Sequence, residues 1–459
     1  MGNHDADGIG PRPAGGTTAD ASEEIYHIVK ITIWGINYEP EPTGIGPFNT
    51  DLCAWLASRG HEVTMLTSFP YYPWWRKRPE DRGKFFETSR RADGVTVRRC
   101  WHYVPGKPST LKRLVHELSF VFTSTLRALF LPRPDVFVVV SPPLFLGLGA
   151  FVAGLLLRRP FVFHVQDLQP DAALGLGMIK PGPAVRALHA LEKWSYRRAA
   201  LVSGISQGMM DAFARKRVPR GKTWLFANWI PDALPAAASA AGGAADGAAS
   251  FRRANRIADG TVLIAYSGNV GMKQGLEVAV AASVGTEAHW AVCGEGAAKE
   301  SLAALVAATP GSRVRLYPLQ PDDSYQALLR EADVSLITQQ RGTGQFFFPS
   351  KLLSILQHGR PVLAVADADS ELARAVAAGG FGRVVPPGDA EALRTAAREM
   401  AAADAAQKQA WAENGRGWVA QFRRSRVLAE FEARLAQVIA PAAGDEAAGT
   451  AMPDKSNCA

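Results

Sequence analysis

The chain has 459 residues, of which 47% are hydrophobic and 20% are charged. This composition excludes a collagen-like or largely disordered chain, and the length predicts two domains rather than one core. The net charge of +8 predicts either a solubilising surface or a patch for an anionic partner. Because no concentrated basic stripe or nucleic-acid-binding motif is present, we do not expect nucleic acid as a partner.

The two ends of the chain differ in composition from the rest. Residues 1–26 are polar and rich in Gly and Pro, with neither the basic start nor the apolar core of a signal peptide. We expect them, and residues 441–459, to be disordered tails. The four cysteines form no CxxC pair, which is typical of reduced thiols in a cytoplasmic protein.

Strand-like apolar runs alternate with helical patterns from residue 27 to residue 232, beginning with IVKITIWGI and ending with KTWLFAN. An Ala/Gly-rich linker or insertion follows at 233–260, and the alternation restarts over 261–409. The pattern predicts an α/β protein with two tandem doubly wound, Rossmann-like domains, followed by helices over 410–440. Ligands of such domains bind at the carboxyl ends of the strands, so we look for motifs there.

Two apolar segments of the first domain raise the question of a membrane. LFLGLGAFVAGLLL (144–157) is shorter than the roughly 20 residues that a span requires, and we expect a buried core helix there. ELSFVFTSTLRALFLP (117–132) is consistent either with core packing or with lying on a membrane. Residues 76–99 hold nine Lys or Arg against four acidic residues, beside the aromatic run YYPWW. This mixture suits an anionic lipid surface, and a solvated loop explains it equally well.

The first strand leads into a glycine-containing loop, EPEPTGIGPFN (39–49). Gly44 and Gly46 allow close approach of a ligand to the backbone, and the helix that follows suits an anion or a polar sugar. A tight turn is the alternative interpretation. The third glycine of a dinucleotide fingerprint is missing, as is an acidic residue after the next strand, which argues against a nicotinamide-dependent oxidoreductase.

A second strand-end motif in the first domain is HVQDLQPD (164–171). His164, Asp167 and Asp171 are candidate functional residues because polar groups in such loops often act on ligands. A buried structural histidine is the alternative for His164. No further His or acidic cluster completes a metal site in the sequence, so no metal is expected.

Three motifs of the second domain suit a nucleotide diphosphate. AYSGNVGMKQGLE offers Gly268, Asn269 and Lys273 after a strand, with a helix predicted to start near Gly275. VCGEG adds Gly294 and Glu295, whose backbone can approach a base or ribose. No Walker loop is present, so binding without nucleotide hydrolysis is expected.

The third motif of this domain is PSKLLSILQHGRP. It predicts a helix with Ser350 as N-cap and Lys351 in the first turn, aimed at the same cleft. The alternative for Lys273 is an ordinary solvent-exposed lysine. Two lysines that both follow strands of one domain are, however, hard to explain unless they bind a ligand.

Taken in order, NYEPEPTGIG, FVFHVQDLQPD, YSGNVGMKQGLE, VCGEG, FPSKLLSILQHGRPVLAV and SELARAV resemble the retaining GT-B glycosyltransferases of the GT4 family. The closest group is the colanic-acid and O-antigen fucosyl- or N-acetylfucosaminyltransferase-like enzymes, and the resemblance covers residues 28–440. It implies a UDP- or GDP-linked sugar held by the second domain, a polyprenyl-diphosphate-linked saccharide held by the first, and terminal helices that cross back to the first domain. It also implies a cytoplasmic enzyme, peripheral on the inner membrane.

The resemblance implies roles for the residues of these motifs. The catalytic candidates are His164 beside the transferred sugar, Lys273 on the diphosphate, and Asp167. The substrate-binding candidates are Gly44, Gly46, Gly268, Asn269, Gly294, Glu295, Ser350, Lys351 and Glu371. No metal or other cofactor is expected, because lysines and helix starts would stabilise the diphosphate.

The chain departs from the family pattern at four positions. Phe346 and Ser354 stand where many relatives carry a pair of glutamates, Asn269 replaces an arginine, and Pro47 replaces a lysine. Glu371 is therefore a substitute candidate for the ribose contact. The remaining alternatives are a UDP-sugar 2-epimerase of the same architecture and the oxidoreductase named above.

Overall fold

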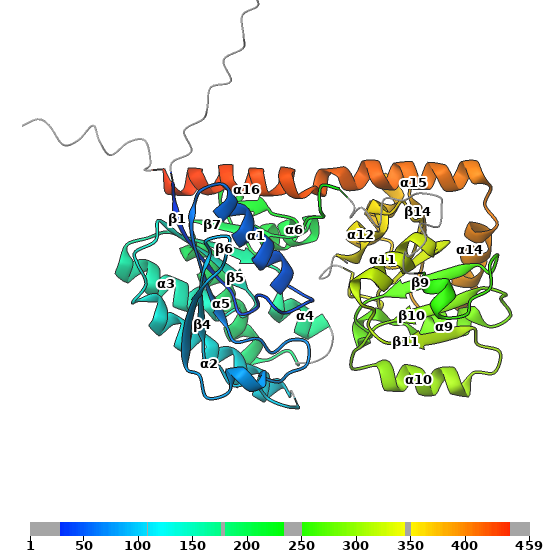
Figure 1. The fold of residues 1–459 in the computed structure, drawn as a ribbon, viewed down its shortest axis with the longest axis horizontal. Coiled ribbons are helices and arrows are strands. Elements are labelled where there is room, and N and C mark those ends of the chain that lie inside the picture. Colours follow the sequence, from blue (N-terminus) through cyan, green and yellow to red (C-terminus); the bar gives the residue numbers. More distant parts are fainter. Residues whose placement is uncertain (1–27, 108, 176–179, 234–249, 345–349, 441–459) are drawn as a thin grey trace, which may run out of the picture.

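The computed structural model describes residues 28–107, 109–175, 180–233, 250–344 and 350–440. They form two α/β domains side by side, joined along one edge by a long pair of helices (Figure 1). The predicted pair of doubly wound domains is therefore confirmed. Both predicted tails, most of the predicted linker, and Phe346 lie outside the described residues.

The first domain is built on an eight-stranded sheet with the order β3-β4-β2-β1-β5-β6-β7-β8. All neighbours are parallel except β3, which pairs antiparallel with β4. Helices cover both faces, so the central strands are apolar throughout, as in VFVVVS of β5. The strands are β1 Lys30–Trp34, β2 Glu62–Ser68, β3 Phe86–Arg90, β4 Thr96–Cys100, β5 Val136–Ser141, β6 Phe161–Val165, β7 Leu201–Gly204 and β8 Thr223–Leu225.

The helices of this domain connect its strands. They are α1 Gly46–Ser58, α2 Thr110–Ala128, α3 Leu146–Leu157, α4 Gln169–Gly175, α5 Pro183–Arg198 and α6 Gln207–Arg215. The predicted core helix α3 is buried on one side only, through Ala150, Ala153 and Gly154, whereas Leu155 and Leu156 on the other side are more than 60% exposed. Within the described ranges, no helix combines the length and the apolar character that crossing a bilayer requires.

The second domain has a parallel six-stranded sheet with the order β11-β10-β9-β12-β13-β14. Its strands are β9 Leu263–Ser267, β10 His289–Cys293, β11 Val314–Tyr317, β12 Val334–Thr338, β13 Val362–Val365 and β14 Gly382–Val385. Its helices are α8 Phe251–Ala254, α9 Glu277–Ser283, α10 Lys299–Ala308, α11 Asp322–Glu331, α12 Lys351–Gln357, α13 Glu371–Gly379, α14 Ala390–Ala401 and α15 Ala405–Val419. Residues 250–260, expected in the linker, belong to this domain, because the buried side chain of Phe251 packs in its core.

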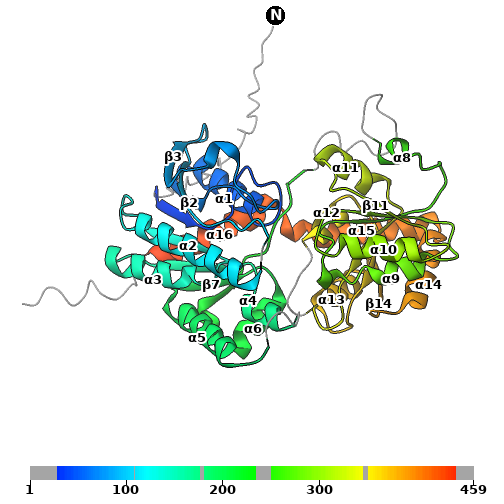
Figure 2. The same cartoon turned by 90° about the horizontal axis from the view of Figure 1, so that it is seen from below.

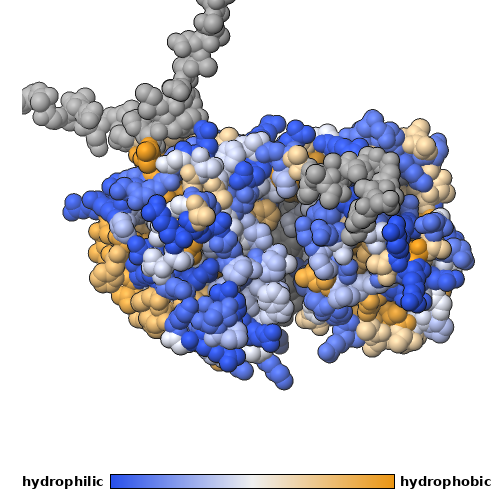
Figure 3. All heavy atoms as spheres, in the orientation of Figure 1, coloured by the Kyte–Doolittle hydropathy of each residue, from blue (hydrophilic) through white to orange (hydrophobic). Residues whose placement is uncertain are grey.

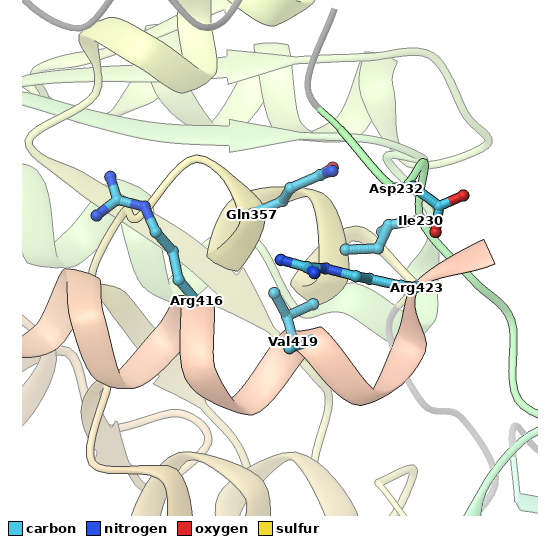
Figure 4. Close-up of a pocket in the computed structure, with 7 residues that line it drawn as sticks. Ile230, Asp232, Gln357, Arg416, Val419 and Arg423 are labelled. Carbon is cyan, nitrogen blue, oxygen red and sulfur yellow. The ribbon is translucent and has the colours of Figure 1, made fainter. Parts of the chain in front are cut away.

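The chain crosses between the domains twice, and the two crossings are hydrogen-bonded to each other. Ile230, on the outward crossing, donates its amide to Phe422 and accepts from the amide of Arg424, at 2.9 and 2.8 Å. A pocket of about 210 Å³ lies beside this hinge, between α12 and the end of α15 (Figure 4). The amide of Gln357 closes one side through a hydrogen bond to the Pro231 carbonyl.

After the second crossing, α16 (Arg424–Ile439) runs back along the first domain (Figure 1). Its Phe431 ring stacks on Phe226 with centroids 4.6 Å apart. At its start, Arg424 forms an ion pair with Asp51 of α1 at 2.8 Å. The last helix of the chain thus completes the core of the first domain and ties the two domains together.

Candidate active site

Residues from the carboxyl ends of the two sheets meet across the cleft that the space-filling view shows between the domains (Figure 3). Asp167 follows β6 of the first domain, and Lys273 follows β9 of the second. Burial raises the pKa of Asp167, and the positive charge of Lys273 opposes that shift. Burial likewise lowers the pKa of Lys273, and Asp167 opposes it. The carboxylate and the ammonium are therefore close enough to interact, although they belong to different domains.

Lys351 joins Lys273 at the same place. Its ammonium lies over the ring of Tyr266, 3.7 Å from the centroid, and a methyl group added to Gly268 would lie 3.1 Å from it. Burial, and then the neighbouring charge of Lys273, lower the pKa of Lys351 to about 7. The structure thus brings together two lysines and a glycine from separate motifs. Two cations held this close, with little water, form a site for an anion.

The glycine loops of the second domain are built against each other. Gly268 donates its amide to the Cys293 carbonyl at 2.9 Å, and Val270 donates to Glu295 at 2.8 Å. A side chain at Gly294 would collide with the Gly268 carbonyl oxygen, so packing of the two loops explains this glycine. The side chain of Glu295 accepts a hydrogen bond from Lys299 at 2.6 Å. Asn269 is exposed, and its carbonyl accepts from the Tyr266 hydroxyl at 2.7 Å.

The helix starts predicted for this domain differ in detail from the structure. A 3₁₀ turn at Met272–Gln274 and a left-handed Gly275 precede α9, which starts only at Glu277. Ser350 takes the N-cap position of α12, but its side chain makes no capping hydrogen bond. Both helices are only seven residues long. The lysines, rather than long helix dipoles, therefore supply most of the positive potential at this site.

The structure buries His164 at the end of β6, in contact with side chains of the first domain, and its predicted place beside the transferred sugar stays a prediction. The side chain is 2% exposed. Its two ring nitrogens contact the Ser203 hydroxyl and the Gln166 amide, both at 2.9 Å. Burial lowers the pKa of His164 to about 3, so the imidazole is neutral at physiological pH. These contacts match the alternative of a buried structural histidine.

Glu371 also differs from its predicted role. It lies in the first turn of α13, and its carboxylate accepts hydrogen bonds from the backbone amides of Gln207 and Gly208, each at 2.9 Å. Those amides begin α6 of the first domain. A carboxylate at a helix N-terminus is a favourable arrangement. In this structure Glu371 therefore connects the two domains instead of lying in a ribose site.

The first glycine loop is organised by a residue that the sequence motifs did not single out. The buried carboxylate of Glu41 accepts hydrogen bonds from the backbone amides of Tyr71 and Tyr72, each at 3.0 Å. Gly44 has a left-handed backbone with φ of 74°, and Gly46 begins α1 directly against Glu41. The sequence did contain an indication of this role, because an acidic residue inside a loop rich in Gly and Pro has no obvious structural function.

Glu117 of α2 is a second residue that the motifs missed. It accepts a hydrogen bond from the side chain of Gln169 at 3.0 Å, directly after the segment that carries Asp167. Burial raises the pKa of Glu117 to about 7. The sequence did not identify Glu117 as a site residue, because it lies within an apolar helix far from any strand end, where we did not look for motifs.

Asp171 belongs to a cluster with His189 and Glu192 that has the spacing of metal ligands. The ammonium of Lys216 forms ion pairs with both carboxylates. This one ammonium compensates one of the two carboxylate charges, and the structure thus completes around Asp171 a cluster that the sequence pattern did not reveal.

Comparison with known proteins agrees with this architecture. Residues 43–229 match the glycosyl transferase 4-like domain, and residues 263–403 match the glycosyl transferases group 1 family. Over 380 residues the chain is 34% identical to WcaI of Escherichia coli K12, which is named as a colanic acid biosynthesis glycosyl transferase. That alignment covers 81% of this chain and 92% of the relative.

Solved structures share the fold. Sucrose-phosphate synthase from Thermosynechococcus elongatus matches with a TM-score of 0.68 and 19% identity over 89% of this chain and 98% of that one. HepE of Anabaena, solved with UDP-glucose, matches with a TM-score of 0.62 and 15% identity over 89% and 100%. The family matches are to transferases, so the epimerase and oxidoreductase alternatives are not supported. The chain belongs to the GT4 family of GT-B glycosyltransferases, in the group of the E. coli colanic acid relative.

Proposed function

We propose that the protein transfers a sugar, with retention of configuration, from a UDP- or GDP-linked donor to a saccharide on polyprenyl diphosphate. The product belongs to bacterial exopolysaccharide or O-antigen synthesis at the inner face of the cytoplasmic membrane. The name of the E. coli relative supports the pathway, and the UDP-glucose complex of HepE supports the class of donor.

One observation carries the proposal: Lys273 and Lys351 converge beside Gly268 at the interdomain cleft. Cleavage of a sugar–diphosphate bond builds negative charge on the leaving diphosphate. Cations that are already in position and poorly hydrated stabilise that charge without reorganisation. Because these ammonium groups repel each other in the free protein, an entering diphosphate relieves repulsion as well as gaining attraction.

The other residues of the cleft follow from this placement. Asp167 lies opposite Lys273 across the domain boundary, where it would position Lys273 or contact the transferred sugar. The Gly44–Gly46 loop, braced by Glu41, would contact the acceptor and the donor phosphates. We propose that no metal is needed, since two lysines perform the task that a divalent cation performs in other transferases.

The experiment that tests the proposal combines binding and product analysis. A thermal-shift screen of UDP- and GDP-sugars identifies the donor, and transfer to a polyprenyl-diphosphate-linked saccharide is then followed with and without EDTA. The account expects an α-anomeric product from an α-linked donor and a rate that EDTA leaves unchanged. An inverted anomer would contradict retention, and loss of activity that Mg²⁺ restores would contradict the metal-free mechanism.

A further inference from the structure

The outer face of α2 is apolar and exposed. The inner face packs on the domain through residues such as His116, Phe120 and Ala128. Large apolar residues recur at helical spacing on the exposed face, at Leu111, Leu114, Val115, Leu118, Phe122 and Leu126. Leu111 and Phe122 are 71% and 70% exposed. An apolar stripe of this kind normally faces a core, and where it is exposed it marks an interaction surface.

The neighbouring helix α3 extends this surface. The two helices lie side by side on the outside of the first domain (Figure 2), and Gly149 leaves room for the hydroxyl of Thr125 between them. Leu148, Leu155 and Leu156 of α3 are exposed. Hydrophobic residues gather at the edge of the domain where α3 lies (Figure 3).

The positive charge of the chain is concentrated in the same region. Residues 74–133 contain 14 Lys and Arg against five Asp and Glu, an excess of nine, whereas the whole chain has a net charge of +8. The rest of the chain therefore contributes no net positive charge. An apolar surface within a basic segment complements an anionic membrane surface and discourages pairing with a second, equally basic copy of itself.

A pocket of about 360 Å³ lies between the end of the YYPWW segment and the chain that follows β4. Its walls include Arg76, Lys77 and Arg82 together with the aromatic rings of Trp75, Trp101 and Tyr103. The acidic residues of this segment form ion pairs with Arg78 and Lys84. Among the described residues, none of the three cations of the pocket has an acidic partner within 4 Å. Lys77 lies over the Trp101 ring, 5.1 Å from its centroid, and is attracted by the charge of Asp81, so Arg76 and Arg82 are the cations best placed to bind an anion.

The pocket adjoins α2, and a neighbouring turn of α2 contacts the segment that follows β6. Arg113 of α2 stacks on Trp75, with its guanidinium carbon 5.2 Å from the ring centroid. The backbone amide of Tyr103 donates to Ser119 of α2 at 2.9 Å. One turn of helix beyond Arg113, Glu117 contacts Gln169 beside the loop of Asp167. A phosphate in the pocket would thus lie beside the helix that carries the apolar face.

We propose that the face formed by α2 and α3 lies on an anionic membrane, and that the basic pocket holds the phosphate of a lipid in that membrane. The shared chemistry is a phosphate group attached to a hydrocarbon chain. We assign it to a phospholipid of the bilayer, because the pocket adjoins the helix whose apolar face is exposed. This assignment does not rest on the proposed function, whereas the alternative of the acceptor's polyprenyl phosphate does, and it is an outcome of the test.

Vesicle flotation of the full chain tests this inference. The expected result is binding to vesicles of phosphatidylcholine with 30% phosphatidylglycerol at low salt, weak binding to pure phosphatidylcholine, and a decrease as salt is raised. Arg76→Gln/Arg82→Gln should reduce partitioning by about tenfold. The control Arg90→Gln/Arg215→Gln removes the same charge from exposed sites outside the pocket, and its loss should stay below about threefold. Leu111→Ser/Phe122→Ser should also abolish binding.

Each other outcome overturns a named part of the proposal. Equal losses in both arginine pairs would reject the pocket, and no flotation at low salt would reject membrane docking. Self-association that Leu111→Ser/Phe122→Ser abolishes would assign the apolar face to a second copy. Stronger binding to vesicles of phosphatidylcholine with polyprenyl phosphate than to phosphatidylglycerol vesicles of the same charge would assign the pocket to the acceptor's phosphate instead of a phospholipid. Nucleotide-sugar binding should stay normal in all variants. If the parent protein binds vesicles but transfers no sugar, the proposed function is refuted and the membrane proposal stands.

Discussion

The ammonium of Lys351 lies 3.7 Å from the centre of the Tyr266 ring, in a site so poorly hydrated and so close to Lys273 that its pKa falls to about 7. A lysine that is half-protonated at neutral pH binds a diphosphate only in its charged form. Donor binding should therefore take up a proton when the solution is above neutral pH.

We predict that the affinity for the nucleotide sugar falls on the order of tenfold between pH 7 and 8.5, because binding must protonate Lys351. Lys351→Arg keeps the charge at all these pH values and should flatten the profile. Isothermal titration in the absence of acceptor measures this, since the diphosphate of a nucleotide sugar does not titrate in the range. A parent profile as flat as that of the arginine variant would contradict the assignment.

Glu371 supplies a second prediction, because its carboxylate holds the first amides of α6 across the domain boundary. Glu371→Gln weakens this charge–dipole contact by about 1 kcal/mol. We expect a larger radius of gyration in X-ray scattering of the free protein and donor affinity within about threefold of the parent. Glu287→Gln, at an exposed ion pair with Arg313, is the control. If Glu371→Gln instead lowers donor affinity more than tenfold and leaves the radius of gyration unchanged, Glu371 contacts the donor.

His164 supplies a third prediction, on stability. Its folded pKa of about 3 lies below the unfolded value of about 6.5, so below pH 6.5 the unfolded chain binds a proton that the folded chain does not. The free energy of unfolding should therefore fall by about 1.4 kcal/mol per pH unit from this residue as pH drops from 6 to 4. His164→Gln should remove this contribution to the pH dependence of the free energy of unfolding, measured by urea titrations at pH 4 to 6. An unchanged slope would show that the imidazole is protonated in the native state.

The sequence allowed the architecture to be predicted because strand and helix periodicities are local. It also identified the two lysines, since each follows a strand of a parallel sheet and the carboxyl ends of such strands meet. The details that the sequence left open depend on side-chain direction. His164 lies one residue before the end of β6 and points into the domain, whereas Asp167, three residues later, reaches the cleft.

Contacts between the domains could not be predicted from the sequence either. Glu371 pairs with amides 163 and 164 residues away, and no local pattern encodes that separation. The apolar stripe on α2 was visible as a pattern, but its hydrophobic spacing is the same for a buried and an exposed face. Only the structure shows that Leu111 and Phe122 are largely uncovered by the described part of the chain.

The most direct measurement of the central claim is single-turnover transfer by Lys273→Ala with saturating acceptor, compared with Lys408→Ala, which removes a partly buried lysine of α15 far along the chain. If Lys273 stabilises the leaving diphosphate, its removal should slow transfer by about 100-fold or more, in line with the loss of one preorganised charge partner, while Lys408→Ala stays near the parent rate. Transfer by Lys273→Ala within about threefold of the parent would contradict the account.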